Sequence, residues 1–343
     1  MSAPFPWLED TWQRLAGYRN ADRVPHALLL TGPAGLGKVT LARNFLKLLL
    51  CRNPVQDTAC DQCDSCAQWR AQSHPDFHEV TLEEDDKGKL RKQIVVDQVR
   101  ALSAKMSLTA RQGGWKLVLV QPADAMNVNA ANSLLKTLEE PAPGSLLLLV
   151  SSRPANLPAT IRSRCQQLAV PRPPAQASFD WLRAEGVSQP ELALAYARGV
   201  PLRAKALAES DFLRQRGELL QRLAAVQGRG ASVVTVAGEF EALDSVAVVE
   251  FLDAVTDDLV RLSQLPEDAT RLRNPDLLNS LKTLADRVNL TALHRYRIAL
   301  GEARRLVETP VNPRLLLESL LLPWAVGMNA ATNERVLDRL LEG

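Results

Sequence analysis

The sequence has no excess of charge of either sign and no long apolar run. It holds 41 lysines and arginines against 39 aspartates and glutamates, so the chain as a whole does not attract nucleic acid electrostatically. The longest later apolar stretches, residues 146–150 and 315–324, are short or carry a glutamate. Residues 1–20 lack a charged segment followed by an apolar run, which a secretory signal requires. We therefore expect a soluble, cytoplasmic protein without membrane contact.

Cysteine is also scarce, and its five copies are unevenly placed. Four of them stand within residues 51–66, while Cys165 lies about a hundred residues later. In a reducing cytoplasm, this crowding favours a bound metal over a disulfide.

The order of sequence patterns predicts an α/β domain followed by helices. A chain of 343 residues, 46% of them hydrophobic, exceeds what one core usually serves, so two or three domains are expected. In the first half, apolar strand patterns alternate with helical ones, which predicts a parallel sheet wrapped by helices. The predicted strands are residues 26–31, 77–82, 116–120 and 146–150, and the predicted helices are residues 39–50, 95–106 and 128–140. Helical patterns dominate after residue 170, although residues 233–238 fit either a strand or a helix.

A phosphate-binding loop lies between the first predicted strand and helix. The sequence GPAGLGKVT at residues 32–40 satisfies the G-x-x-x-x-G-K core. Its glycines let backbone N–H groups converge on phosphate oxygens, and the lysine reaches the β and γ phosphates. The candidate nucleotide-binding residues are Gly32, Gly35, Gly37, Lys38 and Thr40. The Mg²⁺-binding Ser or Thr is replaced by Val39, and Thr40 points about 100° around the helix, so binding of ATP or ADP stays open but weakened.

The acidic residues that hydrolysis needs are missing from the end of the next strand. An Asp there holds Mg²⁺ and a Glu activates water in enzymes of this class. Residues 116–120 are instead followed by Gln121 and Pro122, which can do neither. Asp124 is displaced from the strand end and is expected to be structural or on the surface. We therefore predict that any bound nucleotide is not hydrolysed.

The crowded cysteines have the spacing C-x8-C-x2-C-x2-C. Four thiolates close a tetrahedral Zn²⁺ site and leave no open position, so the site is predicted to be structural. The predicted ligands are Cys51, Cys60, Cys63 and Cys66. Two disulfides are disfavoured by the compartment, and an iron–sulfur cluster by the absence of a redox context. His74 and His78 are spare candidates.

Two further motifs carry a family resemblance. The sequence NSLLKTLEEP at residues 132–141 follows an apolar strand, and Ser163-Arg164-Cys165 follows LPATIR at residues 157–162. With the cysteine cluster inserted after the first helix, these motifs resemble the clamp-loader subunits of bacterial DNA polymerase III. The resemblance spans residues 25–203 and, more weakly, 312–320. The segment after residues 116–120, which lacks these acids, is similar to that of a non-hydrolysing subunit of the family. It differs from that of the ATP-hydrolysing gamma or tau subunit.

The resemblance implies three domains and a set of partners. They are an α/β AAA+ phosphate-loop domain with a parallel sheet (1–170, zinc module 51–66), a small helical lid (171–208) and an all-α collar (209–330), before a tail (331–343). In this family, five subunits form an open ring that uses ATP to place a sliding clamp on primed DNA. The implied partners are the gamma or tau and delta subunits, the clamp and the DNA. The chain alone is expected to lack activity, as one subunit of the nucleotidyltransferase holoenzyme.

The resemblance also assigns roles to single residues. Arg164 is implied to act as an arginine finger in trans, where a guanidinium stabilises charge on a neighbour's γ-phosphate; a surface ion pair is the alternative. Arg203, in GVPLR at residues 199–203, stands where the lid carries a sensor arginine, and Ser151 and Ser152 where a polar sensor is expected. Basic residues that could face DNA, or simply solvent, are Lys105, Arg111, Lys116 and Lys136.

Two other functions fit parts of the pattern. An independent motor ATPase of this fold would hydrolyse ATP alone, which Gln121 and Pro122 disfavour. A zinc-dependent nucleic-acid adaptor would carry a basic, aromatic-rich zinc module. Acidic residues, Asp57, Asp61 and Asp64, surround the cysteines instead, which disfavours phosphate contact.

Overall fold

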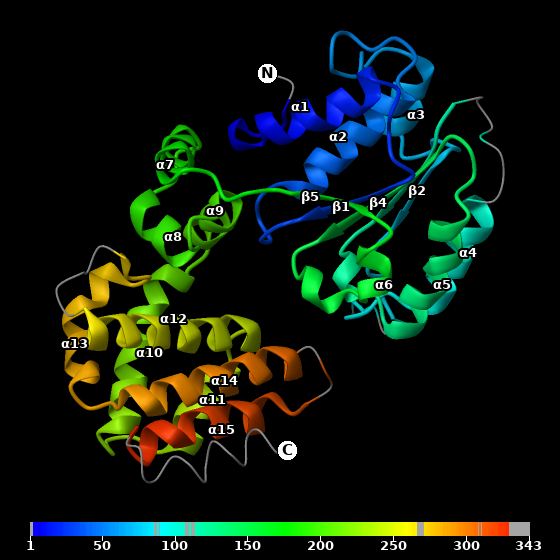
Figure 1. Cartoon of the computed structure of the whole chain (residues 1–343). Helices are drawn as coiled ribbons and strands as arrows, with labels where there is room; N and C mark the ends of the chain where they lie inside the picture. Colours follow the sequence, from blue (N-terminus) through cyan, green and yellow to red (C-terminus); the bar gives the residue numbers. More distant parts are fainter. Residues whose placement is uncertain are drawn as a thin grey trace. The chain divides into compact units, whose positions relative to one another are not determined.

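The computed structural model describes residues 3–85, 88, 90–106, 110, 114–265, 271–307, 309 and 311–328. The chain divides into two compact units, Met1–Trp181 and Leu182–Gly343, and each is treated by itself (Figure 1). The expected tail and Arg111 lie outside the described residues. The division into three domains stays a prediction.

The first unit contains a five-stranded parallel sheet with the order β2-β3-β4-β1-β5. Its strands are β1 Ala27–Thr31, β2 Phe77–Val80, β3 Lys116–Val120, β4 Ser145–Ser151 and β5 Gln166–Ala169. The residues of β3 and β4 are all buried, because helices cover both faces of the sheet. The four predicted strands are confirmed. β5 was not predicted, since only Leu168 of its residues is buried and it has no apolar run.

Helices cover the two faces of this sheet. They are α1 Glu9–Asn20, α2 Lys38–Leu50, α3 Asp64–Arg70, α4 Val96–Met106, α5 Val128–Glu139 and the short α6 Ala159–Arg162. In Figure 1, α1 and α2 lie on one face, whereas α4, α5 and α6 lie on the other. The apolar side chains of α4 and α5, such as Leu102 and Leu134, share a buried cluster with Leu29 and Leu147 of the strands. The three predicted helices are thus confirmed, and α7, Ala175–Ala184, leads to the next unit.

The regular elements described in the second unit are all helical. They are α8 Pro190–Tyr196, α9 Pro201–Glu209, α10 Phe212–Gln227, α11 Val233–Glu241, α12 Ser245–Gln264, α13 Leu278–Ala285, α14 Leu290–Leu306 and α15 Pro313–Ala325. Residues 233–238, which fitted two patterns, begin α11, where the Ser232 side chain caps the helix by accepting from the Thr235 N–H. The largely buried α12 runs through the core of this unit. The fold class expected from the sequence is therefore confirmed: a parallel-sheet phosphate-loop domain followed by helices.

Within the described residues, no helix combines the length and the apolar character that crossing a membrane demands.

Candidate functional site

The phosphate loop lies between β1 and α2, as predicted. Gly32 has φ +141°, and a Cβ there would lie 2.5 Å from the carbonyl oxygen of Val170. Gly37 has φ +83°, and a Cβ there would lie 2.5 Å from the ring of Phe5. Both positions therefore require glycine. Gly35 also has a positive φ, so the three predicted glycines shape one loop.

Lys38 is the first residue of α2, and its side chain turns back onto the loop. Its Nζ donates to the carbonyl oxygens of Gly32 and Pro33, both at 2.7 Å, and to the Ser152 hydroxyl at 3.1 Å. Burial lowers the pKa of Lys38 to about 8, although Asp124 opposes this shift. A phosphate that recruits this ammonium group would have to displace contacts that the loop already makes.

The position that follows Lys38 carries a side chain without an oxygen atom. Val39 follows Lys38 in α2, and Thr40 is exposed. A valine side chain offers no oxygen ligand to Mg²⁺. Lys38 instead donates to the hydroxyl group of Ser152, which follows β4.

Gln121 and Asp124 follow β3, and the side chains of both are engaged in hydrogen bonds. Gln121 Nε2 donates to Glu79 at 3.2 Å, and Asp124 Oδ1 accepts from the Ser152 N–H at 2.9 Å. Burial favours a raised pKa for Asp124, but hydrogen bonds, chiefly from the Ser151 hydroxyl and the Ser152 N–H, hold it below the ordinary value. Asp124 is therefore a buried carboxylate that joins the ends of β3 and β4, consistent with a structural role.

Sequence reasoning missed an aromatic segment beside the loop. Trp7 Nε1 donates to the carbonyl oxygen of Leu36 at 3.0 Å. The ring of Phe5 stacks on that of Trp7, with 5.0 Å between centroids, and Trp181 meets both edge-on. The signal available was the pair of aromatic residues in FPW, but nothing in the sequence indicates that they reach the loop.

Arg164 lies just after α6, about one third exposed. Its Nη1 donates to the carbonyl oxygen of Thr160 at 3.1 Å, and its Nη2 lies 2.7 Å from a carboxylate oxygen of Glu139 at the end of α5. A guanidinium has five N–H donors, so these contacts leave donors toward solvent. The neighbouring thiol of Cys165 is buried, which raises its pKa to about 11.

The four predicted metal ligands converge. The Sγ atoms of Cys51, Cys60, Cys63 and Cys66 all lie within 4.8 Å of one another. Cys51 directly follows α2, whereas Cys63 precedes α3 and Cys66 lies in it. The Cys60 N–H donates to Cys51 Sγ at 3.2 Å, and the Cys63 N–H to Cys60 Sγ at 3.4 Å. Four sulfur donors in this arrangement fit a tetrahedral ion such as Zn²⁺.

The surroundings of the sulfurs favour thiolate at one of them most strongly. Burial favours a raised pKa for Cys63, but backbone N–H groups, including those of Cys66 and Arg52, lower it to about 6. Burial raises the pKa of Cys66 to about 12 and also raises that of Cys51. A cation among the sulfurs stabilises the thiolate form of all four.

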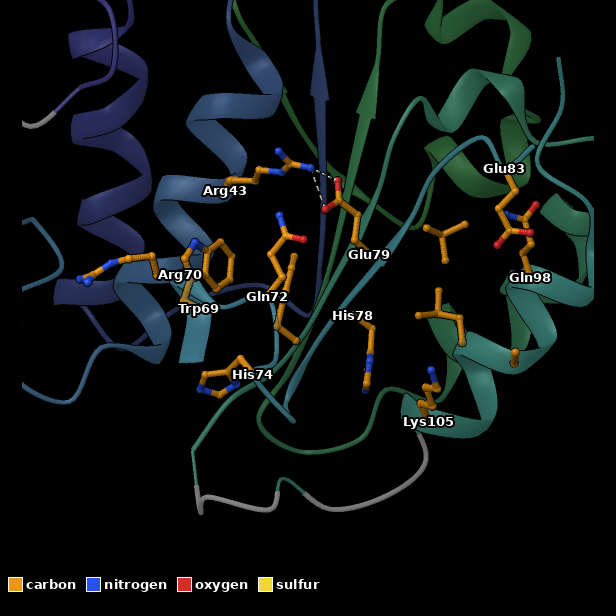
Figure 2. Close-up of a pocket in the computed structure, with 14 residues that line it drawn as sticks. Arg43, Trp69, Arg70, Gln72, His74, His78, Glu79, Glu83, Gln98 and Lys105 are labelled. Carbon is orange, nitrogen blue, oxygen red and sulfur yellow. Dashed lines mark hydrogen bonds and ion pairs between the residues drawn. The ribbon is translucent and has the colours of Figure 1, made fainter. Parts of the chain in front are cut away.

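The two histidines named as spare ligands have other contacts. His74 is buried, with Nε2 3.0 Å from the Ser65 hydroxyl and Nδ1 accepting from the Asp76 N–H. His78 lies in β2 and lines an open pocket of about 640 Å³, with Lys105 across from it (Figure 2). The ion pair of Arg43 and Glu79 lies on one side of the same pocket. The described lining of the pocket includes no residue of the phosphate loop.

Arg203 belongs to the second unit, where it lies in α9. Its Nη2 donates to a carboxylate oxygen of Glu250 in α12 at 2.6 Å, and both side chains are about one third exposed. The structure therefore ties this arginine to a helix of its own unit.

Comparison with known sequences covers nearly the whole chain. A family model described as DNA polymerase III, delta subunit, matches residues 7–174, and one described as DNA polymerase III, delta subunit, C terminal, matches residues 210–325. The DNA polymerase III subunit delta' of Pseudomonas aeruginosa is 35% identical over 95% of this chain and 98% of its own length. The subunit delta' of Escherichia coli is 31% identical over 93% of this chain and 94% of its own length.

Among solved structures, a gamma subunit-related protein of Thermotoga maritima is similar at 16% identity and a TM-score of 0.43, covering 92% of this chain and 99% of its own. The identities to the curated relatives extend over both units. The chain belongs to the family of DNA polymerase III delta' subunits.

Proposed function

We propose that this chain helps a clamp loader place a sliding clamp on primed DNA, and that it stimulates ATP hydrolysis at a neighbouring subunit without hydrolysing ATP itself. Its partners are the gamma or tau and delta subunits of the loader, and through them the clamp and the DNA. Relatives that bear the name of a DNA polymerase III subunit support this assignment.

The proposed loss of hydrolysis in cis rests on three features of one site. Val39 replaces the Mg²⁺ ligand, Gln121 and Pro122 replace the acids after β3, and Lys38 donates to carbonyl groups of its own loop. The first two features remove groups that hold Mg²⁺ and activate water, and the third engages the cation that would reach the γ-phosphate. Gly32, Gly35, Gly37, Lys38 and Thr40 are left as at most a weak site for ATP or ADP, with Arg203 as its proposed sensor.

The observation that carries the proposed action in trans is the exposure of the Arg164 guanidinium at the surface of the first unit, at the end of the sheet opposite to the phosphate loop. Its guanidinium is held by Glu139 and Thr160 and keeps donors toward solvent. A neighbour's γ-phosphate is a dianionic acceptor that a planar guanidinium binds with two N–H groups at once. An arginine supplied in this way increases the rate of phosphoryl transfer by about 10³-fold or more.

A reconstituted clamp loader tests this proposal. The isolated chain should show no ATP turnover, whereas a complex that contains Arg164→Ala should lose much of the ATPase activity of the native complex. Arg100→Ala is the matched control, because Arg100 is also a surface arginine paired with an acid, Asp97. Equal activity of the complexes with Arg164→Ala and Arg100→Ala would exclude the proposed role of Arg164.

We further propose that Cys51, Cys60, Cys63 and Cys66 hold one Zn²⁺ ion with a structural function. The ion would join the end of α2 to the start of α3, because the four ligands come from these two elements and the loop between them. A metal with four protein ligands has no position for substrate.

The three-domain division, 1–170, 171–208 and 209–330, is retained as part of the proposal. It assigns the lid role to α7–α9 and the collar role to α10–α15, and makes the collar the oligomerisation domain.

A further inference from the structure

A cluster of arginines in the second unit has no part in the function proposed above. Asp253 and Asp257 lie one turn apart on α12, with about one tenth of each side chain exposed. Guanidinium groups from three separate segments contact these two carboxylates. The arginine cluster consists of Arg198, Arg273, Arg297 and Arg304.

The four arginines fall into one buried member and three exposed ones. Arg273 is only 6% exposed; its Nη1 lies 3.0 Å from Asp253, and its Nε and Nη2 donate to the carbonyl oxygen of Tyr196. Arg198, Arg297 and Arg304 are 41%, 44% and 45% exposed. Arg273 therefore pairs with buried groups inside the unit, while the other three arginines place cationic groups at the surface.

The cluster carries more positive charge than its carboxylates offset. Four guanidinium groups surround two aspartates, which leaves an excess of two positive charges. Asp258 lies close by and accepts from the N–H groups of Arg273 and Asn274; an excess of one positive charge remains even when it is counted as ionised. Glu250, one turn before Asp253, is paired with Arg203. An anion is the chemical complement of such a surface.

On α14, two arginines with N–H groups available to a ligand flank a position without a side chain. Arg297 lies 3.4 Å from Asp257 and Arg304 lies 2.6 Å from Asp253, and each guanidinium has five N–H donors. Gly301 lies between them at helical spacing, so the three residues share one face. A Cβ at Gly301 would have no atom within 4 Å. The missing side chain therefore leaves room for a ligand to approach both arginines.

We propose that Arg198, Arg297 and Arg304 bind phosphate groups, as a single-stranded nucleic-acid backbone presents them. Guanidinium groups bind phosphate oxygens with paired N–H donors. The tyrosines nearest to the cluster in sequence, Tyr196 and Tyr296, are fully buried and offer no ring on which a base could stack. The contact is therefore with phosphates and is independent of base sequence.

The experiment measures binding of a fluorescent oligothymidylate to the full chain by anisotropy over a range of salt concentrations. The test variant is Arg297→Gln/Arg304→Gln, in which Asp253 and Asp257 keep Arg198 and Arg273. The matched control is Arg305→Gln/Arg314→Gln, which removes the same charge from the same unit at residues paired with Glu302 and Glu318. Loss of two phosphate contacts should weaken binding at least tenfold and lower the salt slope by about 1.4, at about 0.7 per contact.

A second variant distinguishes loss of the binding site from loss of the folded structure. Gly301→Glu removes no contact, replaces an exposed helical glycine by a better helix former, and places a carboxylate between the two arginines. It should weaken oligonucleotide binding about as much as the double variant while the thermal midpoint is maintained. Unchanged binding by the folded Gly301→Glu chain would overturn the proposal.

Competition identifies the source of the phosphate. Inorganic phosphate and a poly-glutamate peptide are titrated against the native chain and against both double variants. The site is supported if the control variant binds oligonucleotide or inorganic phosphate and the test variant does not. Whichever of these two ligands binds more tightly is then identified as the source of the phosphate. Binding of poly-glutamate alone, or equal binding by both double variants, contradicts a phosphate site.

Discussion

Arg164 Nη2 lies 2.7 Å from a carboxylate oxygen of Glu139, and this ion pair joins the segment that follows α6 to the end of α5. The two residues come from the two motifs on which the family resemblance depends, SRC and LEEP. The pair is at the surface, with the side chains of Arg164 and Glu139 37% and 51% exposed. The ion pair orients the guanidinium, and breaking the pair costs little free energy because both groups are exposed to solvent.

The first prediction concerns the free energy that the pair of Arg164 and Glu139 contributes to folding. Replacing Glu139 by Gln should change the free energy of unfolding of the isolated chain by less than about 1 kcal/mol, since exposed ion pairs contribute little. Urea denaturation of the native chain and of Glu139→Gln measures the difference. A loss well above 2 kcal/mol would mean that Arg164 is fixed in a structural role and not available to a neighbouring subunit.

The second prediction concerns the cysteine cluster. Metal analysis of the purified chain should find about one Zn²⁺ per molecule, and Cys63→Ser should remove it. Because a structural metal contributes its binding energy to folding, this variant should lose about 3 kcal/mol or more of unfolding free energy. Cys165→Ser is the control: this buried thiol lies outside the cluster, so its replacement should leave the zinc content unchanged. Equal zinc content in the two variants would exclude the proposed ligands.

The third prediction follows from the burial of Lys38. Its pKa in the folded chain is about 8, against an ordinary value of 10.5. Between these two values the unfolded chain keeps a proton that the folded chain has lost, so the folded state gains stability as the pH rises. From pH 8 to pH 9.5, the unfolding free energy of the native chain minus that of Lys38→Met should therefore rise by about 1.5 to 2 kcal/mol. A constant difference in urea denaturation would show that Lys38 titrates normally.

The fourth prediction concerns nucleotide. Because Val39 offers no ligand to Mg²⁺, the affinity of the isolated chain for ATP should change by less than about twofold when Mg²⁺ is added. Val39→Ser should make binding depend on Mg²⁺ without producing turnover, since Gln121 and Pro122 are unchanged. Calorimetric titration and a phosphate-release assay separate the two effects. Strong Mg²⁺ dependence in the native chain would contradict the described loop.

The sequence was sufficient where chemistry depends on residues that are close along the chain. The phosphate loop, the four cysteines and the apolar strands β1, β3 and β4 all carry short-range patterns, such as fixed glycine spacing or a continuous apolar run. Each of these was located from the sequence to within a few residues. β5 was missed because Gln166, Gln167 and Ala169 are exposed, and only pairing with β1 makes the segment a strand.

Contacts between distant segments could not be predicted. The pair of Arg164 and Glu139, the stack of Phe5 on Trp7 beside the loop, and the arginines around Asp253 all depend on how separate helices pack. Asp124 is the clearest case, since its position after β3 left open whether it is structural or on the surface. Its side chain is buried, and its carboxylate accepts from the Ser152 N–H, a contact between residues that stand 28 positions apart.

The most direct test compares a change in the finger with a change in the loop. Steady-state ATP hydrolysis is measured for clamp loaders reconstituted with the native chain, with Arg164→Ala or with Lys38→Met. Action in trans predicts that Arg164→Ala lowers the rate at the neighbouring site by about 10³-fold or more, whereas Lys38→Met leaves it unchanged. The opposite result, loss of activity with Lys38→Met and normal activity with Arg164→Ala, would contradict the account.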